Sequence, residues 1–189
     1  MLLNDDEQAA RLRRLRWCGI DASTWQRTGK QYRWNYDVVE LGWKYHWNDV
    51  QAAIALAQLA RLPSLNERRW NIAARYSREL ADIVECPAPH DCHTWHLYPI
   101  RVDTDRRDAL LSHLEVSGIS AGVHYKPATM HPLFQGERTP PVTAAEWPRL
   151  VSLPIYPDLS NEEQAEVIAA VRSFFGRAPA REAESEVPA

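Results

Sequence analysis

In WHLYPIRVDTDRRDALLSHLEVSG, residues 95–118, an alternating segment rich in aromatic and β-branched residues runs directly into a helical pattern. The alternation over residues 95–102 predicts a β-strand. The apolar period that follows predicts a helix that ends near Gly118. A second short strand is predicted for GVHY, residues 122–125.

The C-terminal part of the sequence continues the same alternation of elements. Ser160, followed three residues later by Glu163, has the pattern of a capping box and predicts a last helix that runs to about Phe175. Gly176 is expected to end it. Short strands alternating with helices predict an α+β fold, with a small antiparallel sheet flanked by helices.

Upstream of this region the sequence predicts one helix and one long loop. Asn4 and Glu7 form a capping-box pattern that opens a helix over residues 5–17, after a strand remnant at Met1–Leu3. Residues 19–43 contain several aromatic residues and no helical period. They are therefore expected to form a long, partly extended loop.

Two more helices are predicted in the middle of the chain. The helix from Asn48 to Leu62 is apolar on nearly every side, which is typical of a helix buried between layers. A second capping box, SLNE at residues 64–67, predicts a separate helix after it. Residues 143–151 are expected to be only partly helical, because Pro148 has no N–H to donate within a helix.

The composition is that of an ordinary globular protein. The 189 residues are 45% hydrophobic and 25% charged, with a formal net charge of −3. These values argue against disorder, a membrane partner and a nucleic-acid-binding surface, and the N-terminus does not resemble a signal peptide. We therefore expect a cytoplasmic protein with three free cysteines. Residues 177–189 have no apolar period, so we expect a disordered tail there.

Five blocks carry a resemblance to a known family. In order along the chain they are GWKYHWNDVQAAIALAQLARL (42–62), ERRWNIAARY (67–76), WHLYPIRV (95–102), GISAGVHYKP (118–127) and LVSLPIYPDLSNEEQ (150–164). In this order and at these separations the blocks resemble the DegT/StrS-type sugar aminotransferases. Those are pyridoxal-phosphate (PLP) enzymes with the aspartate-aminotransferase fold, fold type I.

The resemblance implies an activity and partners. It implies transfer of an amino group, from a donor such as glutamate, to a keto sugar nucleotide by a homodimeric enzyme. Polysaccharide or lipopolysaccharide biosynthesis is the implied setting. The sequence MLLNDDEQAARLRRLRWCGI (1–20) resembles the segment just after the cofactor lysine of the family. The three lysines here, Lys30, Lys44 and Lys126, are not in that context. We therefore expect the C-terminal portion of such an enzyme, without the Schiff-base lysine and inactive by itself.

The resemblance also implies a division of the chain. Residues 1–47 correspond to the end of the large PLP domain and an interface loop, which makes the fold part of an α/β aminotransferase. Residues 48–84 correspond to connecting helices, and residues 85–176 to a small C-terminal α+β domain. The remaining residues, 177–189, correspond to the tail.

The cofactor-binding residues implied by the resemblance are Lys44 and His46, in a loop that reaches the cofactor phosphate across the dimer interface. A lysine ammonium suits a phosphate dianion, whereas His46 departs from the Arg or Asn that is common at its position. The alternative is that both are ordinary solvated loop residues.

The implied substrate-binding residues are His124 and Tyr125, near the sugar-nucleotide pocket, with local packing as the alternative. Lys126 and His131, on the following loop, are weaker candidates for the same pocket. Tyr32, together with Trp34, could line the pocket mouth or simply pack.

Two other functions compete with catalysis. CPAPHDCHTWH, residues 86–96, contains five possible zinc ligands, but their spacing matches no known zinc-finger pattern. We therefore expect no metal ion at these residues. The other alternative is a non-catalytic remnant that binds or dimerises through the same surfaces.

Overall fold

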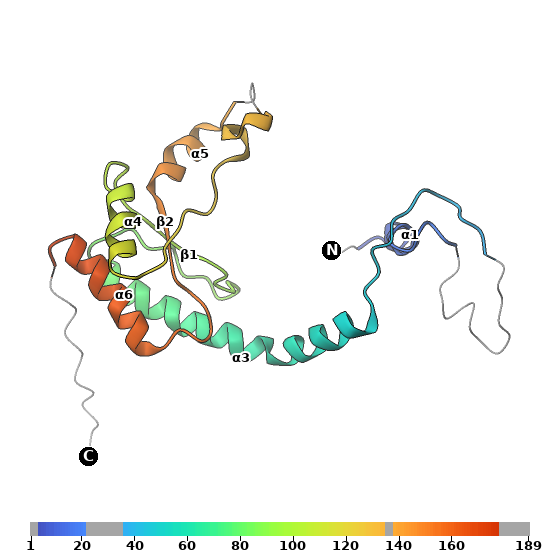
Figure 1. Cartoon of the computed structure of the whole chain (residues 1–189), viewed down its shortest axis with the longest axis horizontal. Coiled ribbons are helices and arrows are strands. Elements are labelled where there is room, and N and C mark those ends of the chain that lie inside the picture. The colour runs from blue at the N-terminus through green and yellow to red at the C-terminus, as the bar shows by residue number, and fades with distance from the viewer. Residues whose placement is uncertain (1–3, 22–35, 135–137, 178–189) are drawn as a thin grey trace, which may run out of the picture. The chain divides into compact units, whose positions relative to one another are not determined.

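The structure of the chain, a computed structural model, describes residues 4–21, 36–134 and 138–177 (Figure 1). The chain forms two units, Met1–Ala60 and Arg61–Ala189. The expected strand at Met1–Leu3 and residues 178–189 of the expected tail lie outside the described residues.

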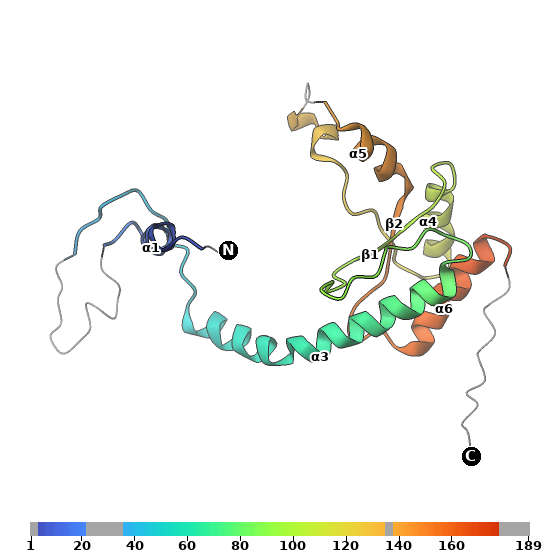
Figure 2. The ribbon, with the colours of Figure 1, turned by 180° about the vertical axis from the view of Figure 1, so that it is seen from behind.

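The helices and strands follow one another in the order that Figures 1 and 2 show. The first unit contains α1 (Asp6–Leu15) and the beginning of α3 (Asp49–Leu80). The second unit contains the rest of α3 and then β1 (Tyr98–Arg101), α4 (Arg107–Val116), the 3-10 turns η1 (Ala128–Met130) and η2 (Pro132–Phe134), α5 (Pro141–Glu146), the 3-10 turn η3 (Trp147–Arg149), β2 (Leu150–Leu153) and α6 (Asn161–Phe174).

Helix α1 is capped by Asp5, so the prediction of Asn4 as the cap was wrong. The Oδ1 atom of Asp5 accepts hydrogen bonds from the backbone N–H groups of Glu7 and Gln8, at 2.9 and 3.0 Å. A carboxylate at this position also complements the positive end of the helix dipole. The helix ends at Leu15 rather than at residue 17, because Trp17 leaves it to pair with Lys44.

Two backbone segments of the first unit run antiparallel at very close range. The backbone N–H of Cys18 donates to the Trp43 carbonyl, and that of Val39 donates to the Gly19 carbonyl, both at 2.9 Å. A Cβ atom on Gly19 would overlap the backbone of the opposite segment, and a Cβ on Gly42 would overlap Gly19. Gly19 also has a φ of +71°, which glycine adopts without strain. Both glycines are therefore required for this crossing.

Helix α3 is one continuous helix, so the prediction of two helices separated near residues 63–64 was wrong. Pro63 lies inside it and removes one backbone hydrogen bond. The Ser64 hydroxyl does not cap a new helix. Instead it donates to the carbonyl of Arg61 at 2.9 Å, as serine side chains do within helices.

The beginning of α3 is exposed, which corrects the prediction that it is buried between layers. Val50, Ile54, Leu56 and Leu59 are each between 60% and 71% exposed. The apolar residues make this helix surface suited to contact another apolar surface. No described part of the chain covers it.

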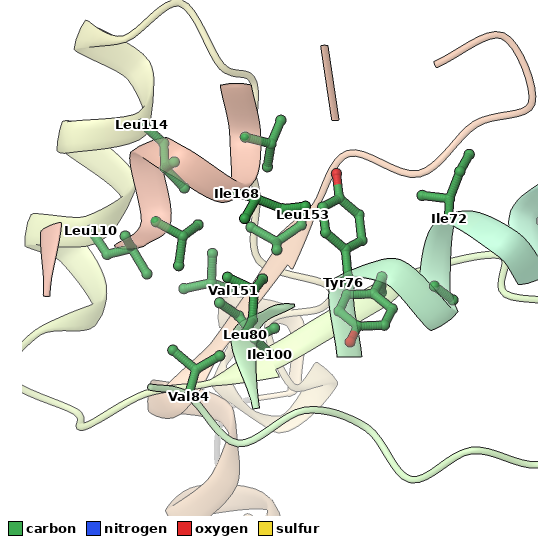
Figure 3. Packing of buried hydrophobic residues seen from close by; sticks show 14 of the residues in the cluster. Ile72, Tyr76, Leu80, Val84, Ile100, Leu110, Leu114, Val151, Leu153 and Ile168 are labelled. Atoms are coloured by element: carbon green, nitrogen blue, oxygen red, sulfur yellow. The ribbon is translucent and has the colours of Figure 1, made fainter. Parts of the chain in front are cut away.

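The second unit has its core between α3, the two strands, α4 and α6 (Figure 3). Strands β1 and β2 pair antiparallel, with Tyr98 opposite Leu153 and Ile100 opposite Val151. These inward residues pack with Tyr76 from α3, and all are nearly or fully buried. The predicted α+β class, with a small antiparallel sheet flanked by helices, is confirmed.

The second strand of the sheet was wrongly predicted. It is β2, whereas GVHY contributes only one bridge, between Gly122 and Ser152. Pairing stops after Gly122, and the chain bends at His124. The prediction of a partial helix over 143–151 missed β2. Pro148 lies in η3, and the chain becomes extended immediately afterwards.

The ends of α4 and α6 agree with the sequence. Ser160 and Glu163 form a reciprocal capping box at the start of α6. Gly118 and Gly176 follow the last residues of the two helices and have φ values of +77° and +68°. The Nε2 atom of buried Gln164 donates to the Ile72 carbonyl at 2.8 Å, which fixes α6 against α3. Within the described ranges, no helix is sufficiently long and apolar to cross a membrane.

The exposed apolar surface at the start of α3 leads to a testable prediction about self-association. We expect the chain to self-associate at micromolar concentration, because exposed apolar patches of several hundred Å² promote association. Sedimentation should give an average mass above the 21.7 kDa of one chain. The double variant Ile54→Lys, Leu56→Lys should move the mass toward that of the monomer. Val116→Lys, at an exposed position in the second unit, is the control and should leave it unchanged. A wild-type chain that sediments as a stable monomer would contradict this expectation.

Candidate functional site

Lys44 and His46 both lie against the ring of Trp17. The Lys44 ammonium is 4.4 Å from the centroid of the indole, within the range of a cation–π contact. The His46 imidazole meets the same indole edge-on, with centroids 4.0 Å apart and an interplanar angle of 74°. The three residues together are the Trp17 cluster.

The backbone explains why these side chains meet. Residues 44 and 46 are two apart in an extended segment, so they lie on one face of it. The segment is fixed by an antiparallel bridge between Trp17 and Lys44 and by the Tyr45 N–H, which donates to the Arg16 carbonyl at 2.9 Å. The crossing of Gly19 and Gly42 makes this pairing possible.

The Trp17 cluster has polar atoms that need partners. The indole N–H of Trp17 and the Nδ1 atom of His46 are buried and have no hydrogen-bond partner among the described residues. Lys44 forms no ion pair with a described acidic residue. A cationic ammonium beside an unpaired N–H donor is suited to an anion with several oxygen atoms, such as a phosphate.

The pKa of His46 is lowered below its ordinary value. Partial burial is the largest cause, followed by repulsion from the positive charges of Lys44 and Arg16. His46 is therefore biased toward its neutral form, in which one ring nitrogen donates and the other accepts. The permanent positive charge of the cluster then comes from Lys44.

Trp17 was missed by the sequence analysis. It was placed at the end of the predicted helix 5–17, with no functional role. Its position beside Lys44 depends on pairing between residues 27 positions apart, which no local pattern in the sequence encodes. The expected pair of Lys44 and His46 is nevertheless brought together in the structure.

His124 and Tyr125 are adjacent to one another in the second unit. Their rings lie 4.8 Å apart at an angle of 87°, and the peptide bond between them is cis. The imidazole lies over Gly122, since a Cβ at that position would be 3.2 Å from its Cε1 atom. Tyr125 is 69% exposed, so its hydroxyl is accessible to a ligand.

The other candidates have weaker support. Lys126 and His131 are exposed on the segment that follows. Tyr32 and Trp34 lie outside the described residues. The two residue pairs, Lys44 with His46 and His124 with Tyr125, belong to different units of the chain.

In the loop with five possible zinc ligands, two of the histidine side chains are hydrogen-bonded to the backbone. The Nδ1 atom of His90 accepts from the Cys92 N–H at 3.2 Å, and that of His93 accepts from the Trp95 N–H at 2.9 Å. Among residues 4–21, 36–134 and 138–177, no group of three or more His, Cys, Asp or Glu side chains could hold a metal ion. The geometry gives the zinc alternative no support.

A family comparison identifies the group of proteins to which the chain belongs. The model of the DegT/DnrJ/EryC1/StrS aminotransferase family matches residues 1–172. The chain belongs to this family. The match includes both units and all of the candidate site residues, so the expectation drawn from the five sequence blocks is confirmed.

Solved structures of aminotransferases from this fold-type I group resemble the chain. The aminotransferase TlmJ from Streptoalloteichus hindustanus is 30% identical, with a TM-score of 0.79 over 92% of this chain. PseC from Helicobacter pylori, an aminotransferase involved in the biosynthesis of pseudaminic acid, is 27% identical with a TM-score of 0.80 over 92% of this chain. DesV from S. venezuelae, solved in complex with a ketimine intermediate, is 33% identical with a TM-score of 0.76 over 94% of this chain. The chain covers 46%, 47% and 46% of these three proteins, respectively, which is about half of their length.

The pKa of His46 tests the geometry of the Trp17 cluster. Lys44→Gln removes one of two nearby positive charges, so the pKa of His46 should rise toward its ordinary range. It should stay below that range, because burial is the largest cause of the shift. An NMR titration of the imidazole measures this. Arg13→Gln, an exposed charge elsewhere on α1, is the control and should have little effect. An unchanged titration curve in Lys44→Gln would contradict the close contact.

Proposed function

We propose that this chain is part of a PLP-dependent aminotransferase that transfers an amino group from glutamate to a keto sugar nucleotide. The observation that carries the proposal is membership of the aminotransferase family over residues 1–172. Supporting it, the solved relatives include aminotransferases of sugar biosynthesis. A cytoplasmic, homodimeric enzyme that makes amino-sugar precursors of a polysaccharide or lipopolysaccharide is the setting proposed.

The Trp17 cluster fits the phosphate group of PLP. Its buried, unpaired indole N–H and the Lys44 ammonium offer donors and positive charge in one place. In the proposed enzyme, Lys44 binds the phosphate as a compact charge, and the Trp17 indole N–H and His46 donate further hydrogen bonds to it. In a homodimer, this loop is proposed to serve the cofactor of the second copy. Bound PLP would carry the amino group from donor to acceptor, and its electron-withdrawing ring would supply the chemistry.

Lys44 is not proposed as the lysine that binds the cofactor covalently. Its ammonium lies over the face of an indole and is used there as a charge. Lys126 is exposed on a loop of the second unit, and Lys30 lies outside the described residues. We propose that the Schiff-base lysine is not among these three. The isolated chain is then expected to be inactive.

The second unit is proposed to bind the sugar nucleotide. The imidazole of His124 and the phenol of Tyr125 meet edge to face, and Tyr125 presents a ring and a hydroxyl to solvent. A tyrosine hydroxyl can hydrogen-bond a sugar or phosphate oxygen, and its ring can stack on a base or sugar. Tyr32 is proposed to contribute to the same pocket.

The proposed activity can be tested directly. The chain is expressed with the adjoining coding sequence in frame, and 2-oxoglutarate formed from glutamate is measured with a panel of keto sugar nucleotides. Production of 2-oxoglutarate that depends on a keto sugar nucleotide supports the proposal. A protein that retains PLP but uses none of the sugars as acceptor would overturn the substrate class. A protein that binds no PLP would overturn the enzyme proposal itself.

Lys44→Ala should weaken cofactor binding in that enzyme. The substitution removes a charge-assisted hydrogen bond worth about 1.5 to 3 kcal/mol. The affinity for PLP should therefore fall by about ten-fold to a hundred-fold, as measured by equilibrium dialysis. Lys44→Arg should be intermediate, because the guanidinium keeps the charge but has a different shape. Lys126→Ala is the matched control. Equal affinity in wild type and Lys44→Ala would leave Lys44 as an ordinary loop lysine.

His124→Ala should have the opposite pattern. Its imidazole is proposed to contact the sugar nucleotide, so affinity for that substrate should fall while PLP is retained normally. Substrate affinity is measured by calorimetry and PLP retention by absorbance. Loss of PLP in His124→Ala, with normal substrate affinity, would contradict the assignment of His124.

A further inference from the structure

Ser152 has a buried hydroxyl group with no partner. The residue is 3% exposed, and its Oγ atom finds no hydrogen bond among the described residues. Buried hydroxyl groups in proteins nearly always have a protein or water partner. An unpaired one at the centre of a sheet therefore calls for a specific explanation.

The strand neighbours of Ser152 explain why no direct partner exists. On one side it is opposite Pro99 of β1, and on the other it exchanges two backbone hydrogen bonds with Gly122, at 2.7 and 3.1 Å. Opposed residues in antiparallel strands have their side chains on the same face. Proline and glycine offer no polar side chain. Neither neighbouring strand residue therefore offers the Ser152 hydroxyl a side-chain donor or acceptor.

The imidazole of His124 lies on this face. A Cβ on Gly122 would be on the same face as the Ser152 side chain, and the imidazole contacts that position. The ring folds back over Gly122, with its Cε1 atom 3.2 Å and both ring nitrogens 3.9 Å from the Cβ position that glycine leaves empty. In a closely paired antiparallel bridge, that position is about 4.5 to 5.5 Å from the Cβ of the opposite residue. The imidazole is therefore within reach of Ser152 through one water molecule.

The Nδ1 atom of His124, like the Ser152 hydroxyl, lacks a hydrogen-bond partner in the described part of the chain. It is buried and has no hydrogen-bond partner among the described residues. Two buried, unpaired polar atoms on the same face of a three-stranded arrangement can satisfy one another through a single water. Nε2 is not among the buried, unpaired atoms, so it is the ring nitrogen that is left for a ligand.

We propose that Ser152 is a positioning residue for His124, acting through a water that joins its hydroxyl to Nδ1. The hydroxyl donates to the water, and the water donates to Nδ1. Nδ1 is then the acceptor, and the proton of the neutral imidazole resides on Nε2. A fixed Nε2–H donor suits an oxygen atom of a diphosphate or sugar. Binding of a sugar nucleotide by this Nε2–H group rests on the proposed function. The assignment of the tautomer does not depend on the proposed function.

The tautomer can be measured on the chain without any ligand. Long-range ¹H–¹⁵N correlation spectra distinguish protonated from unprotonated ring nitrogens, at a pH about two units above the ordinary histidine pKa of about 6.5. His113 provides an internal standard. Its Nε2 lies 3.1 Å from the Ala170 carbonyl, which only accepts, so Nε2 must carry the proton.

We expect His124 of the wild type to be in the Nε2–H form, as His113 is. Ser152→Ala should convert His124 to a mixture of both tautomers while leaving His113 unchanged. Ser152→Thr keeps a hydroxyl at the same position and should restore the single form. Ser112→Ala, an exposed serine of α4, is the matched control and should change neither histidine.

Three results would overturn the positioning role. These are a wild-type His124 with its proton on Nδ1, an unchanged tautomer in Ser152→Ala, or a mixture in Ser152→Thr as large as in Ser152→Ala. The first needs no variant, so it decides the matter even if Ser152→Ala does not fold.

A second measurement separates this inference from the proposed function. Binding of uridine diphosphate to the chain is compared in wild type, Ser152→Ala and His124→Ala. A smaller loss of affinity in Ser152→Ala than in His124→Ala supports a role of Ser152 that acts through His124. If uridine diphosphate does not bind to the wild type, the substrate role of His124 fails. The tautomer experiment still decides whether Ser152 positions the ring.

Discussion

The second unit depends on the position of β2 between two partners. On one edge the strand pairs with β1, and on the other it pairs with the backbone of Gly122. Its residues alternate between the two faces, so Val151 and Leu153 complete the apolar core while Ser152 lies on the opposite face. One strand thus completes the core, and in our proposal its Ser152 also positions the ring of His124. A shift of one residue in its pairing would exchange the two faces and destroy both.

A similar constraint operates in the first unit. Gly19 and Gly42 allow two backbone segments to approach more closely than any residue with a Cβ would permit. That approach places Lys44 and His46 on the indole of Trp17. In both units, then, glycines in closely paired segments make room, for the opposite backbone at Gly19 and Gly42 and for the imidazole of His124 at Gly122. In both, a buried ring nitrogen is left without a protein partner among the described residues.

The sequence predicted well those features that depend on neighbours along the chain. The capping box of Ser160 and Glu163 and the glycine that follows α4 are local signals, and both were correctly predicted. Features that depend on distant partners were missed. The strand β2 was overlooked because Pro148 was interpreted as an interruption of a helix. Trp17 and Ser152 have their roles through residues elsewhere in the chain, and neither has a local signature.

Two of the incorrect predictions have an identifiable physical cause. A helix ending at Leu62 and a second one opened by the capping box at residues 64–67 were expected, yet α3 is continuous and contains Pro63, whose fixed φ is compatible with a helix and whose missing N–H removes one hydrogen bond. The start of α3 was expected to be buried, yet Ile54 and Leu56 are exposed. An amphipathic or apolar pattern indicates that one surface of a helix is suited to contact other apolar groups. Whether that surface is covered depends on atoms outside the segment, so periodicity alone cannot establish burial.

The identity of residue 46 affects how the Trp17 cluster would hold a phosphate group. An arginine there would carry a permanent charge, whereas burial, Lys44 and Arg16 lower the pKa of His46 and favour its neutral form. In the proposed complex, a phosphate dianion beside the ring opposes the repulsion from those cations and favours the protonated imidazole. Binding of the phosphate is then coupled to uptake of a proton by His46. Lys44 attracts the phosphate, and protonated His46 adds an attraction that strengthens as the pH falls.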